Sequence, residues 1–233
     1  MARSVTIGGL FSGIGGLELG VERAVRGETI WQAERDPYAR QVLERHWPGV
    51  RRYEDVCEID KQAIRPDIIC GGFPCQDISA AGKQAGITGE KSGLWAEFSR
   101  IVGVLRPCHV FVENVAALAT NGLHRVLGDL AAFGYDAEWD TLGACCIGAP
   151  HQRERVFILA TNPNCDCESG CAIHAEAPPM PGAPAPIWPD LPGSVGVDDG
   201  AAGRMDRLRC LGNAVVPQQA ELEYRKLLDR SRK

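Results

Sequence analysis

Long apolar runs are missing from this sequence of 233 residues. None of its apolar stretches approaches the roughly 20 consecutive residues that a membrane-spanning helix needs. The sequence also lacks the secretory pattern of basic residues followed by an apolar stretch, because its first apolar run leads directly into glycines. These two absences predict a cytoplasmic protein with no membrane partner.

A surplus of positive charge is also missing, since the formal net charge is −5 at pH 7. Proteins that bind nucleic acids usually present a basic surface, so the overall charge argues mildly against such a partner. The distribution is uneven: residues 161–200 contain no Lys or Arg and six acidic residues, whereas residues 201–233 contain eight basic and four acidic residues. Any surface for DNA must therefore come from local clustering of basic side chains.

A disulfide framework is not indicated, although the chain has ten cysteines. Such frameworks are usual in short, secreted, loop-rich proteins, and this chain has none of these properties. We therefore expect free thiols. Six cysteines are interpreted as structural residues without a chemical role, namely Cys57, Cys70, Cys108, Cys145, Cys146 and Cys210.

Four soft metal ligands, Cys165, Cys167, Cys171 and His174, lie within ten residues. Thiolates and imidazoles are the ligands of structural zinc sites, so zinc binding is one interpretation. The spacing is tighter than in common zinc modules and there is no second Cys-x2-Cys pair, which favours a loop with free cysteines. We predict no metal site and keep zinc at these four residues as the alternative.

Strand-like and helix-like patterns alternate over residues 1–160. This alternation predicts an α/β fold with a Rossmann-like, mostly parallel sheet and helices on both faces. Helices are expected after the first glycine-rich turn and over 36–47, 92–105 and 122–133, and strands over 5–11, 29–34, 67–71, 109–112, 135–142 and 155–160.

The composition changes sharply after residue 160. Residues 161–200 hold eight of the fifteen prolines, which disfavours helices and central strands there and predicts a loop or semi-rigid linker. A final helix is expected over 217–230. We therefore divide the chain into a main domain over 1–160, a short irregular segment over 161–202, and a C-terminal segment over 203–233 that returns to the main domain.

A glycine-rich turn, Phe11-Ser12-Gly13-Ile14-Gly15-Gly16, joins the first expected strand to the first expected helix. Glycines there let the backbone approach a ligand and leave helix N–H groups directed at it. Glu34 at the end of the next strand suits ribose hydroxyls, and Asp55 after a further strand-like segment suits an adenine amino group. A tight connection without a ligand, or a dinucleotide site with its phosphate on Arg51 or Arg52, remains open at this point.

A cysteine held by a proline follows another buried strand. Pro74 fixes the backbone directly before Cys75, at the edge of the sheet where α/β enzymes bind ligands. Residues 79–93 are rich in Gly, Lys and small side chains, as in a loop that closes on a substrate. A thiolate at this place can act as a nucleophile, although a buried structural cysteine is the usual alternative.

A carboxylate and two guanidiniums complete the set of candidate catalytic residues. Glu113 stands near the end of an expected strand and suits acid–base chemistry or binding of an amidine-like base edge. Arg153 and Arg155 alternate along the start of the last strand of the main domain, so they point to one face. Together they can lower the pKa of a nearby thiol and hold a phosphate, whereas either arginine alone is more often a surface residue.

The order and spacing of these motifs resemble those of the C5-cytosine-specific DNA methyltransferases. The resemblance covers residues 1–160 and about 203–230. It rests on Phe11-Ser12-Gly13-Ile14-Gly15-Gly16, Pro74-Cys75-Gln76, Glu113-Asn114-Val115, Arg153-Glu154-Arg155 and Gly212-Asn213-Ala214-Val215.

This resemblance implies a cofactor, S-adenosylmethionine, and a substrate, a cytosine flipped out of DNA. Cys75 would add to cytosine C6, Glu113 would bind or protonate N3, and Arg153 and Arg155 would steady the thiolate and the target phosphate or base. The residues implied at the cofactor are Phe11, Gly13, Gly15, Leu17, Glu34 for the ribose, Asp55 for the adenine, Pro74, Asn213 and Val215.

Two departures from the family pattern stand out. His151 replaces a glutamine that is common in the family, and the acidic segment over 161–200 stands where the family has a much longer recognition domain. Reading a DNA sequence requires side chains at base edges and cations on phosphates, which this segment does not obviously supply. The sequence thus predicts relaxed specificity or a protein partner that supplies recognition.

Three alternatives to an active DNA methyltransferase follow from the same residues. The first is a module that binds cofactor or partner without catalysis. The second is a nicotinamide-dependent oxidoreductase with a redox cysteine, which leaves Glu113, Arg153, Arg155 and Asn213 without a role. Methylation of tRNA, as in a related branch, is the third, and no feature of the sequence points to RNA.

Overall fold

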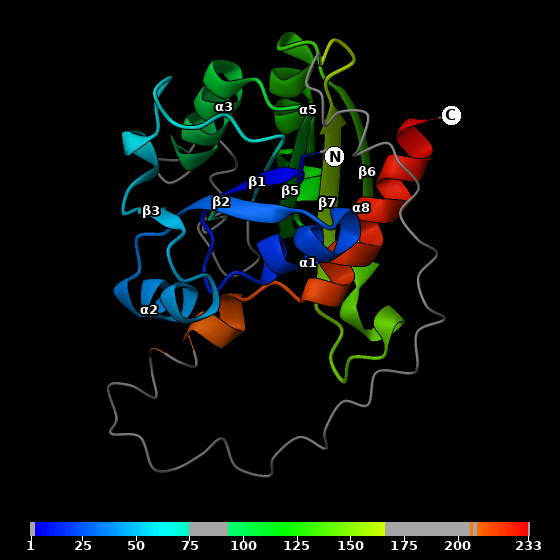
Figure 1. The fold of residues 1–233 in the computed structure, drawn as a ribbon. Coiled ribbons are helices and arrows are strands. Elements are labelled where there is room, and N and C mark those ends of the chain that lie inside the picture. Colours follow the sequence, from blue (N-terminus) through cyan, green and yellow to red (C-terminus); the bar gives the residue numbers. More distant parts are fainter. Residues whose placement is uncertain (1–2, 75–92, 166–205, 207–208, 233) are drawn as a thin grey trace.

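A computed structural model describes residues 3–74, 93–165, 206 and 209–232. Seven strands form one sheet in the order β3-β2-β1-β4-β5-β7-β6 (Figure 1). Every neighbouring pair is parallel except those that β7 makes with β5 and β6, so the predicted mostly parallel α/β fold is confirmed. The strands are β1 (Thr6–Leu10), β2 (Glu28–Ala33), β3 (Arg51–Tyr53), β4 (Ile68–Gly71), β5 (His109–Val115), β6 (Asp136–Gly143) and β7 (Glu154–Thr161).

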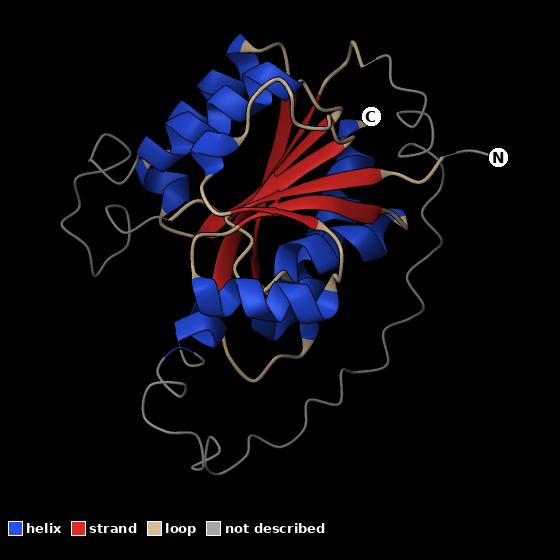
Figure 2. Cartoon of the chain, turned by 60° about the vertical axis from the view of Figure 1, so that its left-hand side comes forward, coloured by secondary structure: helices blue, strands red, loops and turns tan. Residues whose placement is uncertain are grey.

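Helices cover both faces of the sheet (Figure 2). The buried side chains of α1 and α8 pack on one face, and those of α3 and α5 pack on the other. No helix among the described residues is long and apolar enough to cross a membrane. The helices are α1 (Gly16–Val25), α2 (Pro37–His46), α3 (Gly93–Leu105), α4 (Leu118–Asn121), α5 (Leu123–Ala132) and α8 (Pro217–Ser231), with 3-10 turns η1 (Val56–Glu58) and η4 (Ala144–Ile147).

Helix α2 begins where its capping residues predict. The Asp36 carboxylate accepts hydrogen bonds from the N–H groups of Tyr38 at 2.8 Å and Ala39 at 3.1 Å, and Pro37 occupies the first helical position. These bonds satisfy N–H groups that have no partner within the helix. The cap fixes the chain directly after Glu34, whose carboxylate accepts a hydrogen bond from the N–H of Asp36.

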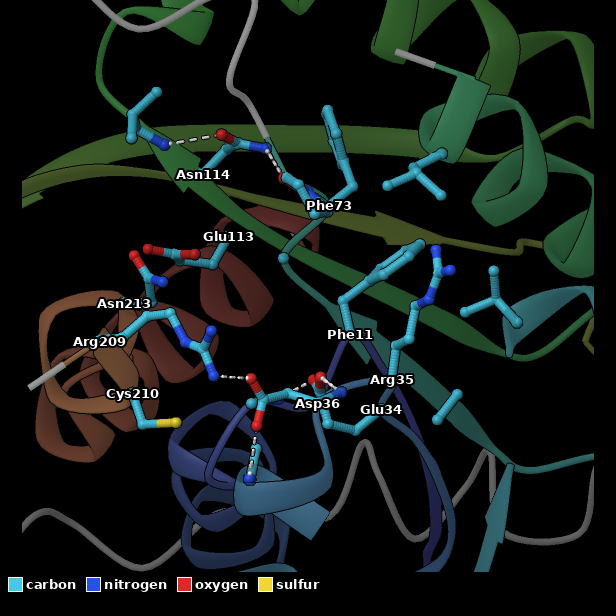
Figure 3. Close-up of a pocket in the computed structure, with 18 of the residues that line it drawn as sticks. Phe11, Glu34, Arg35, Asp36, Phe73, Glu113, Asn114, Arg209, Cys210 and Asn213 are labelled. Atoms are coloured by element: carbon cyan, nitrogen blue, oxygen red, sulfur yellow. Dashed lines mark hydrogen bonds and ion pairs between the residues drawn. The ribbon is translucent and has the colours of Figure 1, made fainter. Parts of the chain in front are cut away.

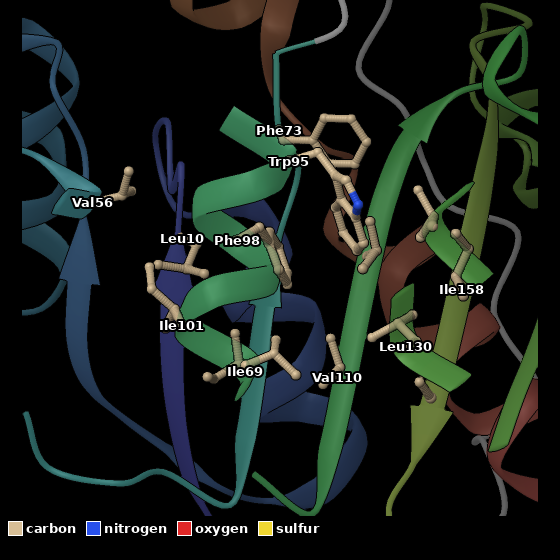
Figure 4. Packing of buried hydrophobic residues seen from close by; sticks show 14 of the residues in the cluster. Leu10, Val56, Ile69, Phe73, Trp95, Phe98, Ile101, Val110, Leu130 and Ile158 are labelled. Atoms are coloured by element: carbon tan, nitrogen blue, oxygen red, sulfur yellow. The ribbon is translucent and has the colours of Figure 1, made fainter. Parts of the chain in front are cut away.

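The larger hydrophobic core lies between the sheet and helices α3 and α5. Trp95, Phe98 and Ile101 of α3 are at most 2% exposed and pack against Leu10 of β1 and Ile69 of β4 (Figure 4). Neighbouring strands in a parallel sheet present side chains to both faces, so both faces need a cover. The apolar spacing of α3 provides that cover on this side.

Helix α8 brings the end of the chain back to the opposite face of the sheet. It packs on α1, β6 and β7, and its Tyr224 is fully buried beside Phe111 and Phe157. The Tyr224 hydroxyl lies 2.6 Å from Nδ1 of His109, which ties α8 to β5. The helix expected over 217–230 is therefore present and completes the second core.

Two cysteines contradict the expectation of free thiols. Cys108 and Cys165 form a disulfide with Cα atoms 5.3 Å apart. Cys108 precedes β5 and Cys165 follows β7, and these antiparallel neighbours pair His109 with Thr161. The strand order thus brings together two residues 57 positions apart, which the sequence could not indicate. The described cysteines with free thiols are Cys57, Cys70, Cys145, Cys146 and Cys210.

Candidate active site

A cavity of about 600 Å³ opens at the carboxyl ends of the parallel strands (Figure 3). Its wall combines the glycine-rich turn, the ends of β2, β4 and β5, the start of β7, and the C-terminal segment before α8. This edge is the usual ligand site of open α/β sheets, and the volume suits a small cofactor with room for a substrate group. Six of the predicted cofactor residues line it: Phe11, Gly13, Glu34, Asp55, Pro74 and Asn213.

Glu34 is fixed against the glycine-rich turn. Its carboxylate accepts hydrogen bonds from the N–H of Gly13 and from the N–H of Asp36, both at 2.7 Å. Phe11 and Gly13 adopt left-handed backbone conformations, with φ of 54° and 55°, which fold the turn over the end of β2. A carboxylate held in this way is preoriented for the hydroxyl groups of a ligand.

Asp55 lies on the cavity wall as the capping residue of η1. Its carboxylate accepts a hydrogen bond from the N–H of Cys57 at 2.9 Å. That backbone hydrogen bond, with help from the nearby charge of Arg35, holds the pKa of Asp55 below its usual range. Asp55 is therefore an ionised acceptor in the cavity wall, which fits a ligand group that donates hydrogen bonds.

Glu113 and Arg155 form an ion pair deep in the cavity. Arg155 Nε lies 3.0 Å from Glu113 Oε1, and the Glu113 side chain is only 10% exposed. Burial raises the pKa of Glu113, and the charges of Arg155 and Arg153 oppose that rise. The sheet register explains the contact, because Arg155 of β7 pairs with Val115 of β5. Glu113 lies two residues before Val115 on β5, so its side chain points to the same face of the sheet as that of Arg155.

The segment that leads to Cys75 passes directly over Glu113. A Cβ atom on Gly72 would lie 2.8 Å from Glu113 Oε2, so only glycine fits there without displacing the carboxylate. The side-chain amide of Asn114 donates to the carbonyl of Phe73 at 3.1 Å and anchors the next residue. Pro74 lines the cavity, whereas Cys75 itself lies outside the described residues.

The C-terminal segment closes one side of the cavity. Arg153 donates to the carbonyl of Gly212 at 2.8 Å and to the carbonyl of Ala214, which places Asn213 on the cavity wall. Val215 approaches the start of α1 so closely that its carbonyl would collide with any side chain at position 16. Arg153 thus positions this segment as well as lining the cavity.

Three of the predicted cofactor residues do not line this cavity. Leu17 is 4% exposed and packs in the core beneath α1, Gly15 packs against Trp47, and Val215 lines two neighbouring grooves. The two arginines proposed for a phosphate pocket lie elsewhere: Arg52 donates to main-chain carbonyls at the end of α2, and Arg51 stacks on Tyr53 at 4.7 Å. The dinucleotide alternative therefore lacks the two arginines that were proposed to bind its phosphate.

Arg35 and Arg209 are among the cavity residues that the sequence reasoning missed. Arg35 follows Glu34 on the wall, and Arg209 of the C-terminal segment forms an ion pair with Asp36 across the cavity mouth. The position of Arg35 next to a predicted ligand was a usable signal. No local pattern linked Arg209 to Asp36, because 173 residues separate them.

Of the four possible zinc ligands, the structure describes Cys165. Cys165 is bonded to Cys108, so its sulfur is not a thiolate ligand in this state. The other three, Cys167, Cys171 and His174, lie outside the described residues. Elsewhere in the described chain, no group of three or more His, Cys, Asp or Glu side chains is arranged to hold a metal ion.

A glycine-rich turn after β1, a carboxylate after β2 and a cavity at the carboxyl edge define a Rossmann-like cofactor-binding enzyme fold. The chain matches the C-5 cytosine-specific DNA methylases over residues 5–183 and belongs to that family. The resemblance inferred from the five motifs is therefore confirmed. S-adenosylmethionine, the cofactor predicted from the sequence, is the methyl donor of this family.

Relatives of known type match the same part of the chain. Type II methyltransferase M2.BsuMI of Bacillus subtilis is 37% identical over 163 residues, which are 65% of this chain and 41% of the relative. Type II methyltransferase M.HhaI of Haemophilus parahaemolyticus is 34% identical over 155 residues, which are 64% of this chain and 47% of the relative. The chain spans about half or less of the length of these relatives.

Solved structures show the same fold. An E. coli prophage-encoded protein described as a DNA modification methyltransferase has a TM-score of 0.56 and 26% identity, covering 68% of this chain and 47% of that chain. A mutant of Spodoptera frugiperda DNMT2 has a TM-score of 0.58 and 21% identity, covering 70% and 51%. At that lower identity, the likeness supports the fold alone.

Replacing Arg153 by Met is expected to weaken binding of S-adenosylmethionine about 10-fold. Hydrogen bonds from a charged donor contribute about 1.5–3 kcal/mol, and the two from Arg153 hold Asn213 at the cavity. Calorimetric titration with the cofactor measures the change. Arg125→Gln, which breaks an exposed pair with Asp129 on α5, is the matched control and should bind normally. Equal affinity in both variants would contradict this role.

Proposed function

We propose that this protein transfers a methyl group from S-adenosylmethionine to C5 of cytosine in DNA through a covalent bond between Cys75 and cytosine C6. The observation that carries the proposal is the Glu113–Arg155 pair, which lies under Gly72 and beside Pro74 in the same cavity as Glu34 and Asp55. The cavity therefore holds an acid, two guanidiniums and the residue before the candidate nucleophile. It also holds the two carboxylates that are expected to bind a nucleoside.

The cavity residues fit S-adenosylmethionine. Glu34 is held by two N–H groups and faces the cavity, where it suits the ribose hydroxyls, and the ionised Asp55 suits the adenine amino group. Phe11 lines the same cavity and offers a ring face for the base. When bound, the cofactor supplies an electrophilic methyl group.

Glu113 would act on N3 of the flipped cytosine. Burial raises its pKa, so more of the carboxyl can carry a proton near neutral pH than in an exposed glutamate. Arg155 opposes that shift and fixes the orientation of the carboxyl group. The balance between burial and the guanidinium suits a group that must give up a proton during the reaction.

Cys75 would supply the nucleophile. Its thiolate adds to C6 as N3 gains a proton from Glu113, so the pyrimidine loses its aromaticity and electron density collects at C5. C5 would then bond to the methyl carbon while the bond from that carbon to the cofactor's sulfur breaks, and the sulfonium would leave as a neutral thioether. Loss of the C5 proton to solvent and return of the N3 proton to Glu113 would restore the aromatic ring and expel the Cys75 thiolate. Arg153 and Arg155 favour the thiolate form through their positive charge.

We also infer that target recognition differs from that of the longer relatives. Residues 161–202 would form a small remnant of the recognition region between a catalytic domain over 1–160 and a C-terminal segment over 203–233. This segment is acidic up to residue 200, so base-specific contacts would be few and a protein partner would supply the rest. The expected result is relaxed specificity for this chain alone.

The test is transfer of labelled methyl groups to random-sequence DNA, followed by mapping of 5-methylcytosine at single-base resolution. We expect methylation by the wild-type chain, no detectable transfer by Cys75→Ser, and unchanged affinity of that variant for the cofactor. Cys145→Ser removes an exposed cysteine and should keep full activity. Full activity of Cys75→Ser would exclude the covalent mechanism.

A second candidate is a relative that binds the cofactor or a partner without catalysis. It is favoured by the acidic segment over 161–200. Calorimetry separates the two candidates, because cofactor binding without methylation of any DNA would favour the binding module. Robust turnover would eliminate it.

A further inference from the structure

Three buried polar side chains lie beneath the glycine-rich turn without hydrogen-bond partners among the described residues. Both oxygens of Glu18, both polar atoms of the Gln32 side chain and the hydroxyl of Ser12 have none. Glu18 is 1% exposed, Gln32 is 0% exposed and Ser12 is 8% exposed. Native proteins rarely leave buried polar groups unpaired, so these atoms require partners.

The three side chains belong to one place in the fold. Gly9 of β1 pairs in register with Gln32 of β2, so the two residues point to the same face of the sheet. That face is covered by α1, and the space where a Gly9 side chain would stand is occupied by the Glu18 carboxyl and, 2.7 Å from the Cβ position, by the Ser12 hydroxyl. The absence of a side chain at Gly9 therefore lets the Glu18 carboxyl and the Ser12 hydroxyl lie directly against the backbone of β1.

We propose that Glu18, Gln32 and Ser12 form an internal water-binding site that supports the glycine-rich turn from below and so positions it for the cofactor. Water makes two to four hydrogen bonds in such sites, and this one offers a carboxyl, an amide and a hydroxyl. The proposal that this site positions the turn rests on the proposed binding of the cofactor there. The proposal of a water site does not depend on the cofactor.

The Glu18 carboxyl can carry a proton in this site near neutral pH. Burial raises its pKa to about 7, the charges of Glu22 and Glu34 push in the same direction, and the adjacent Ser12 hydroxyl opposes them. The Cys70 thiol also lies on this side of the sheet, and burial keeps it neutral by raising its pKa. Arg52 pairs in register with Gln32 on the neighbouring strand. Its guanidinium donates hydrogen bonds to carbonyls at the end of α2 and forms an ion pair with Glu44.

The turn depends on this support because Ser12 stands between two of its left-handed residues, Phe11 and Gly13. The N–H of Gly13 donates to Glu34, and the N–H of Ser12 donates to the carbonyl of Ala33 at 3.0 Å. A shift of Ser12 would therefore move the carboxylate that faces the ligand. Glu18 is a positioning residue, since it is buried and does not line the cavity.

The test compares Glu18→Gln, Glu18→Leu and the exposed α1 control Arg23→Gln. Gln keeps a neutral polar group, so its affinity for S-adenosylmethionine should stay within about 2-fold, whereas Leu leaves Gln32 and Ser12 unpaired and should weaken binding about 10-fold. A crystal structure of the wild type should show ordered water between Glu18 and Gln32. Infrared spectra near pH 6 should show a protonated carboxyl band that Glu18→Gln lacks.

Stability gives a readout that is independent of the cofactor. The folded pKa of about 7 exceeds the ordinary value of 4.5, so the contribution of Glu18 to stability is present below pH 4.5 and is lost as pH rises through 7. Urea unfolding should show the wild type weakening between pH 5 and pH 8 more than Glu18→Gln does.

The outcomes distinguish the two proposals. A direct Glu18–Gln32 bond without water, or equal pH dependence in the wild type and Glu18→Gln, would overturn the water site even if the cofactor binds. Normal binding by Glu18→Leu would overturn the positioning role. If the wild type binds no cofactor while the water and the carboxyl band are present, the proposed function fails and the water site stands.

Discussion

Replacing Glu113 by Gln should lower kcat for DNA methylation by about 10²–10⁴-fold, the usual range for loss of a positioned acid. The amide has the same size but cannot donate a proton from a neutral acid to N3, and it cannot pair with Arg155 as an ion. The wild-type rate should also fall as pH rises above the raised pKa of Glu113, because the acid form is then depleted. Single-turnover kinetics over a pH series measures both effects.

Glu154→Gln provides the matched control for that experiment. Glu154 is exposed and lies between the two arginines of the cavity, so the same chemical change is made one strand position away from Arg155. It should retain activity within about 3-fold, as expected for a surface substitution. A Glu113→Gln enzyme with normal kcat and an unchanged pH profile would contradict the role of Glu113 as an acid.

Replacing Tyr224 by Ala should lower the free energy of unfolding by about 3–5 kcal/mol, the range for removing a large buried aromatic side chain. Tyr224 is fully buried between α8 and the sheet, with Phe111 at a ring-centroid distance of 5.1 Å. Its loss would leave a cavity at the contact that holds α8 on the main domain. Urea unfolding followed by circular dichroism measures the change.

Tyr224→Phe separates packing from hydrogen bonding. It keeps the ring and removes only the hydroxyl that meets His109, so the expected loss is about 1 kcal/mol. Because α8 follows the segment that carries Asn213, Tyr224→Ala should also weaken cofactor binding, whereas Tyr224→Phe should not. Equal stability of both variants would contradict a packing role for the Tyr224 ring.

Local signals explain why much of the fold was predictable. The Asp36 cap with Pro37 predicted the start of α2, and the glycines after β1 predicted the turn that joins β1 to α1. Each of these depends on residues within a few positions of one another. The apolar runs of β4 and β5 are continuous because both faces are covered, which made them visible as buried strands.

The error about the cysteines came from a contact between distant segments. The Cys108–Cys165 disulfide depends on β7 lying beside β5, and nothing in the spacing of the cysteines indicates that order. The place of Leu17 at the cofactor, implied by the resemblance, stays a prediction; the structure shows its side chain in the core beneath α1. A motif identifies a segment that meets a ligand without deciding which of its side chains face it.

The sequence by itself determined the residue types that carry the chemistry and the elements on which they stand, because caps, glycine conformations and apolar runs act over short distances along the chain. Only the tertiary structure decided that Arg155 pairs with Glu113, that Arg153 holds the carbonyls around Asn213, and that Glu18 is buried over Gly9. These contacts depend on strand order and register, which are set by the packing of whole faces.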